Sequence, residues 1–144
     1  REKMPMLRVV LTGLFAIAAA TSALAQDVSK SPAGAKVTIL EPANGATVSS
    51  PVTVKFGITG MEISPAGTAK ENAGHHHLII DKTLADPKAG IPADDNHKHY
   101  GKGQTEAVIE LKPGEHTLQL ILADHNHIPH DPVVQSEVIK ITVK

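Results

Sequence analysis

Apolar residues in this chain alternate with polar ones or form short β-branched runs, and no segment keeps the 3.6-residue period of a helix. Pro, Gly and Asn bound these runs, as is typical of strands joined by turns. The pattern predicts six or seven short strands, at 36–40, 46–58 (interrupted at Pro51), 75–81, 105–111, 116–123 and 133–143. Sheets with one apolar face need a second layer, so we expect an all-β sandwich over residues 36–144.

Turn residues indicate how neighbouring strands connect. Pro113-Gly114 lies between two alternating runs and predicts a hairpin that pairs residues 105–111 with 116–123. The segment 41–52 (EPANGATVSSPV) resembles the opening of bacterial immunoglobulin-like modules. We therefore expect an antiparallel immunoglobulin-like β-sandwich of about seven strands, without the tryptophan of antibody domains.

The N-terminal 25 residues have the three parts of a secretory signal peptide. A basic stretch precedes an apolar run at 9–20, and Ala23-Leu24-Ala25 is a small-x-small cleavage site. We expect removal of residues 1–25, leaving a flexible leader at 26–35 and a His-rich domain at 36–144. The mature protein would be periplasmic or secreted, with no segment inserted in a membrane.

Composition excludes several classes of function. The 14 basic and 15 acidic side chains give a net charge of -1, which offers no electrostatic basis for binding nucleic acid. The absence of cysteine excludes disulfides, thiolate nucleophiles and iron–sulfur clusters. Blue-copper centres also need a cysteine, and Met61 is the only methionine beyond residue 25, which argues against a thioether site. Nitrogen-rich sites for Cu(II) or Zn(II) remain.

Histidine is the residue type that carries the chemistry, because eight of the nine histidines fall in three groups. Side chains at positions i and i+2 of an extended strand share a face, so pairs with this spacing can chelate a metal ion. Neutral imidazole is the commonest protein ligand for Cu(II) and Zn(II). The candidate ligands are His75, His77, His97, His99, His125, His127 and His130. We expect them to gather at one end of the sandwich.

The remaining histidines and nearby carboxylates have other expected roles. His76 points to the face opposite its two neighbours, where it is either a core residue or a ligand of another site. His116 begins a strand after a Pro-Gly turn, which favours a structural hydrogen bond. Three acidic residues adjoin the groups and either ligate the metal or accept the second ring N–H of a ligand histidine: Asp81, Asp124 and Asp131.

Four blocks of the sequence carry a family resemblance: GHHHLIID (Gly74 to Asp81), HKHYGKGQTEA (His97 to Ala107), PGEHTLQL (Pro113 to Leu120) and DHNHIPHDPVVQSE (Asp124 to Glu137). In combination they resemble the bacterial exported family catalogued as domain of unknown function 4399, over about residues 70–144. The resemblance implies an exported single-domain β protein whose His-bearing blocks belong together. It implies no activity.

Three classes of function are compatible with these features. The first is an exported metal-binding module that handles or stores Cu(II) or Zn(II), which needs only the His site. The second is a metal-dependent hydrolytic or redox enzyme, with an open coordination position and a general acid or base such as Glu106 or Asp94. The third is an adhesion or ligand-binding sandwich without metal, disfavoured because stacking aromatics are nearly absent. No catalytic signature marks the carboxylates, so the sequence favours the binding module.

Overall fold

The computed structural model describes residues 27–144, which form two packed β-sheets and contain no helix. The expected signal peptide lies outside these residues. The strands are β1 (Lys36–Glu41), β2 (Thr47–Val48), β3 (Val52–Thr59), β4 (Glu62–Ile63), β5 (Ala73–Ile80), β6 (His97–Tyr100), β7 (Glu106–Ile109), β8 (Gly114–Ala123) and β9 (Ile139–Val143). No helix of this part of the chain is long and apolar enough to cross a membrane.

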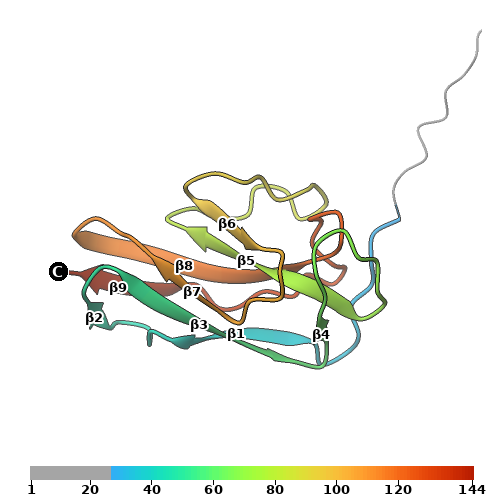
Figure 1. Cartoon of the computed structure of the whole chain (residues 1–144), viewed down its shortest axis with the longest axis horizontal. Coiled ribbons are helices and arrows are strands. Elements are labelled where there is room, and N and C mark those ends of the chain that lie inside the picture. Colours follow the sequence, from blue (N-terminus) through green and yellow to red (C-terminus); the bar gives the residue numbers. More distant parts are fainter. Residues whose placement is uncertain (1–26) are drawn as a thin grey trace, which may run out of the picture.

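The two sheets form a sandwich (Figure 1). The smaller sheet has the order β1-β3-β7, and the larger has the order β2-β9-β8-β5-β4, with β6 paired to β5 as well. The orders β1-β3-β7 and β9-β8-β5 correspond to the A-B-E and G-F-C strands of an immunoglobulin domain. The predicted all-β, immunoglobulin-like sandwich is therefore confirmed.

Two details of the pairing differ from the expectation. The predicted hairpin is wrong, because β7 pairs with β3 whereas β8 pairs with β5 and β9. The turn at Pro113-Gly114 thus carries the chain from one sheet to the other, a connection that uses the same turn residues as a hairpin. The sheets are also not wholly antiparallel, since β2 pairs with β9 and β4 with β5 in parallel.

Strand β5 is buried on both of its faces, and this burial positions the site. Leu78 and Ile80 belong to the main core between the sheets, together with Val54, Leu120 and Ile141. Ile79 points the other way, into a smaller apolar cluster with Ile91, Ile121 and Ala123. The segment between β5 and β6 lies over that outer face, on the side opposite β1 and β3 (Figure 1). A strand covered on both faces can hold buried side chains in two separate environments.

The N-terminal segment of the described chain is tied to the loop after β8. The backbone N–H of Ser31 donates to the carbonyl of Asp131, and the N–H of Asp131 donates to the carbonyl of Ser29. The Ser31 hydroxyl donates to the carbonyl of Pro132. Part of the segment expected to be a flexible leader therefore contacts the domain, while the boundary at residue 36 stays a prediction.

Candidate metal centre

Two histidines of β5 point to the outer face of the larger sheet. His75 and His77 alternate with His76 and Leu78, and lie on the same face as Ile79. They are 1% and 0% exposed, because neighbouring strands and loops cover this face. The spacing of two that the sequence shows therefore becomes a pair of buried imidazoles side by side.

A third histidine reaches this pair from the loop after β8. Asp124 shapes that loop: its Oδ1 accepts the backbone N–H groups of Asn126 and Ile128, and its carbonyl accepts the N–H of His127. The Ser29 hydroxyl donates to the other carboxylate oxygen, at 2.8 Å. The backbone of His127 then turns into the left-handed region, with φ of 62°, which Asn, Asp and His tolerate better than most residues.

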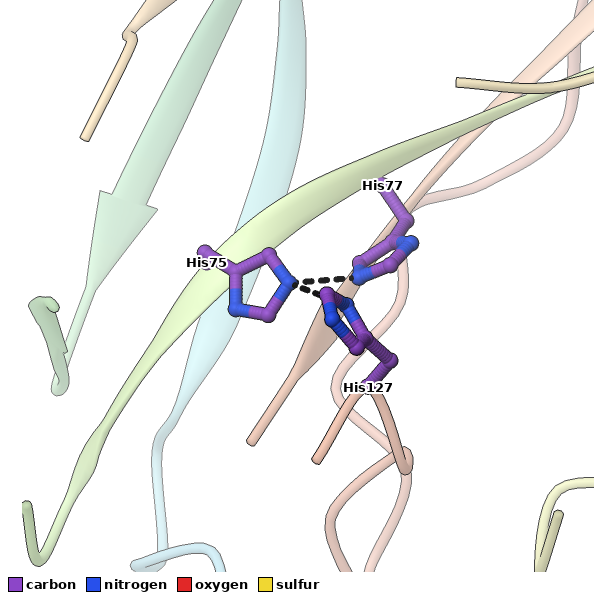
Figure 2. A group of neighbouring side chains, drawn as sticks. All are labelled: His75, His77 and His127. Atoms are coloured by element: carbon purple, nitrogen blue, oxygen red, sulfur yellow. Dashed lines mark hydrogen bonds between the residues drawn. The ribbon is translucent and has the colours of Figure 1, made fainter. Parts of the chain in front are cut away.

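The three imidazoles converge on one point (Figure 2). Nε2 of His75 lies 2.8 Å from Nε2 of His77 and 2.9 Å from Nδ1 of His127. All three nitrogens lie within 4.8 Å of one another. We call His75, His77 and His127 the three-histidine cluster.

Burial and mutual repulsion keep these imidazoles neutral. Burial and, after it, the neighbouring His127 and His99 lower the pKa of His75 to about 4. Burial lowers the pKa of His77 to about 2, and it also lowers the pKa of His127. Neutral imidazole is the form that binds a metal ion, so the cluster is ready to ligate at neutral pH.

The second nitrogens of the buried pair have no oriented partner. Within residues 27–144, Nδ1 of His75 and Nδ1 of His77 are buried without a hydrogen bond. Ligand histidines usually donate this N–H to a carboxylate or carbonyl. Packing and the Nε2 contacts within the cluster therefore orient these two rings, and their unpaired Nδ1 atoms cost free energy in the folded protein.

His99 lies beside the cluster without being part of it. It is directly opposite His77 in the pairing of β5 with β6. Its ring centroid lies 5.0 Å from that of His127, 5.7 Å from that of His77 and 6.5 Å from that of His75. Its side chain is exposed, whereas the pair on β5 is buried. The structure thus brings four of the seven candidate ligands together.

The other three candidates make separate contacts. Nδ1 of His97 is 2.7 Å from the carboxylate of Asp94. Within the described chain, this ring forms no close ring pair with the cluster or with His99. His125 contacts the side chain of Asn126 at 3.1 Å. Nε2 of His130 donates to the carbonyl of Ala73, and its ring lies over Gly74, where a Cβ atom would be 2.9 Å from it. The His130 contact ties the loop after β8 to β5, and the His97 contact ties the preceding loop to β6, whereas the His125 contact stays within its own loop.

Two of the three acidic candidates make their contacts away from the cluster. Asp81 accepts from His116 at 2.7 Å and from the backbone N–H of Thr117. Asp131 is exposed and pairs with Lys30 at 3.0 Å. Of the three carboxylates, only Asp124 is close to the cluster, and it acts on the backbone of the loop, not on a ring nitrogen. Glu106 is exposed on β7, in the other sheet.

The two histidines set aside in the sequence have structural environments. His76 lies in the interior, with its ring centroid 5.0 Å from that of Phe56 and both ring nitrogens buried without partners in the described chain. His116 donates to Asp81 and to the carbonyl of Lys112, which raises its pKa. His76 is therefore a core residue, and His116 forms the structural hydrogen bonds that its position predicted.

One family profile matches the chain, that of the "Domain of unknown function (DUF4399)", over residues 54–144. The chain belongs to this family. The resemblance seen in the four sequence blocks is thus confirmed, and the match begins earlier than expected, within β3. No curated protein and no solved structure matches the chain significantly.

The DUF4399 match includes the whole three-histidine cluster, but the residues that position it are harder to find in a sequence. Ser29 precedes the matched region and supports the cluster only through Asp124. Ile91, from the segment between β5 and β6, donates its backbone N–H to the carbonyl of His127. Neither contact can be predicted from the spacing of the ligand residues in the sequence.

Proposed function

We propose that this DUF4399 domain is an exported metal-binding module in which His75, His77 and His127 bind Cu(II) or Zn(II). The observation that carries the proposal is the convergence of three neutral, largely buried ring nitrogens, two of them 2.8 and 2.9 Å from a third. Buried polar atoms normally have hydrogen-bond partners. The three imidazoles can satisfy only part of one another's hydrogen-bonding capacity. A cation that all three bind explains their arrangement better.

Two of the three nitrogen–nitrogen distances in the cluster fit pairs of bonds to one metal ion. With bonds of about 2.0–2.1 Å, adjacent nitrogens lie about 3.3 Å apart in a tetrahedral site and about 2.9 Å apart at right angles. The two short distances of the cluster, 2.8 and 2.9 Å, are closer to the right-angle value. Right angles are typical of tetragonal Cu(II), which imidazole sites also bind more tightly than Zn(II). The same distances are also those of hydrogen bonds, so our choice of Cu(II) as the first ion to test rests on its tighter binding to imidazole.

The residues around the cluster favour metal handling or storage over catalysis. Asp94 is occupied by His97, and Glu106 lies in the other sheet, so neither carboxylate is placed beside the cluster. A catalytic metal site needs an open position together with a positioned acid or base. The enzyme reading stays as the alternative, and a turnover assay on the metal-loaded protein would test it.

The proposal is tested by metal titration of the tagless chain, with a matched pair of variants. His127→Asn keeps a residue that tolerates positive φ but removes one ligand nitrogen. His125→Asn makes the same change two residues away, outside the cluster. We expect one equivalent of Cu(II) to bind the parent and His125→Asn equally, and at least about tenfold weaker binding by His127→Asn. Equal affinity in all three proteins would contradict the proposal.

A further inference from the structure

Exposure decreases step by step along the histidines of the outer face. His99 is exposed, His127 is partly buried, and His75 and His77 are fully buried. Successive ring centroids are 5.0 Å apart from His99 to His127, 4.8 Å from His127 to His75, and 4.6 Å from His75 to His77. The four imidazoles form a continuous path from solvent to the most buried ligand.

We propose that His99 is an exchange ligand, which takes a copper ion from a donor in solution and passes it to the three-histidine cluster. This inference rests on the proposed function, because it describes how the ion reaches that cluster. The donor would be a chelate or protein that presents Cu(II) with a replaceable ligand. Each step is a ligand substitution, in which a bond to the incoming imidazole forms as a bond to the previous ligand breaks, with copper remaining Cu(II).

The placement of His99 suits transfer better than permanent ligation. Its nitrogens are not among the three that lie within 4.8 Å of one another. It sits on β6, a four-residue strand paired with β5, and because its side chain is exposed it has room to move. An ion on its ring is nevertheless one ring away from His127. A side chain with these properties can bind the ion transiently without belonging to the final site.

The other histidines near the surface are less suited to this role. His97 is buried and its Nδ1 is held by Asp94. On this face, the close ring pairs of the described chain join only His99 and the three histidines of the cluster. His125 is in none of them. Its side chain instead lines a separate hollow with Lys30 and Lys70. His99 is the exposed imidazole that adjoins the ligands.

Rates and affinity separate an exchange ligand from a resident one. A residue that only carries the ion in transit lowers the barrier in both directions equally, so its loss changes the rates of uptake and release but not their ratio. Loss of a resident ligand raises the dissociation constant instead. Stopped-flow absorption is suited to this test, with Cu(II) supplied as its glycine complex and release measured into excess EDTA.

We expect His99→Asn to slow uptake and release alike by about tenfold, the effect of one lost transient ligand, while the dissociation constant stays within about twofold. His125→Asn is the matched control and should leave both rates unchanged, and thermal melts would verify that both variants are folded. A dissociation constant that rises with His99→Asn would make His99 a resident ligand and overturn the inference, as would unchanged rates. A parent chain that binds no copper would instead overturn the proposed function itself.

Discussion

The three-histidine cluster and His116 have opposite electrostatic environments. In the three-histidine cluster, burial and neighbouring imidazoles lower the pKa values, and no carboxylate within residues 27–144 forms a hydrogen bond with a ring. At His116, hydrogen bonds to Asp81 and to the carbonyl of Lys112 raise the pKa. Burial without an acceptor favours the neutral imidazole that can bind a metal ion, whereas a carboxylate partner favours the protonated form. The same residue type thus serves two purposes, and the acceptor decides which.

The largest expected effect is the loss of stability of the metal-free protein in acid. Burial lowers the pKa values of His75 and His76 to about 4 and that of His77 further, against about 6.5 in the unfolded chain. The unfolded state therefore binds more protons below pH 6.5, and stability falls as the pH falls toward the folded values. Three groups cost at most about 4 kcal/mol per pH unit together. Urea unfolding in chelator from pH 7.5 to 4.5 measures this, and a flat profile would refute the burial of neutral histidines.

Replacing His77 by Leu should separate ligation from packing. His77→Leu removes a ligand nitrogen and an unpaired buried nitrogen, but fills nearly the same space. We expect copper affinity to fall at least about 100-fold, while the stability of the metal-free protein stays equal or rises by about 1 kcal/mol. Copper titration and urea unfolding with and without EDTA provide both values. If the variant is several kcal/mol less stable without metal, the ring is structural.

His116→Ala should give the reverse result. Its raised pKa means that protonated His116 stabilises the fold fully below about pH 6.5, and that this contribution disappears as the pH rises through the folded value. We expect a loss of about 1 kcal/mol at pH 6 and a smaller loss at pH 9, since the pair with Asp81 is partly exposed. Copper affinity should not change. A variant that is equally destabilised at both pH values, or that binds copper less well, would remove the contrast with the cluster.

Ser29→Ala should have the smallest effect. It removes one hydrogen bond to Asp124, in the loop that holds His127. We expect a loss of about 0.5–1 kcal/mol in stability and a copper affinity lowered by about twofold to fivefold. Ser31→Ala is the matched control, because its hydroxyl bonds the same loop at Pro132, away from His127. An equal effect of the two variants on affinity would mean that Asp124 does not position the ligand.

Parts of this architecture can be read from the sequence, and other parts require the folded chain. Alternation on 75–81 placed His75 and His77 on one face, because strand periodicity is a local property. The i, i+2 spacing also marked His125 and His127, but the turn shaped by Asp124 brings only His127 to the cluster. The hairpin prediction was wrong since a turn does not reveal whether the next strand stays in the same sheet. Ile91 packs with Ile79 and bonds the backbone of His127, and these contacts join segments that are distant in sequence.

Binding of copper by the three-histidine cluster is tested most directly by diffraction from crystals of the copper-loaded protein at the copper absorption edge. We expect one anomalous peak about 2.0–2.1 Å from Nε2 of His75, Nε2 of His77 and Nδ1 of His127. A peak beside the His97–Asp94 pair or near His125, or the absence of a peak in the loaded protein, would contradict this expectation.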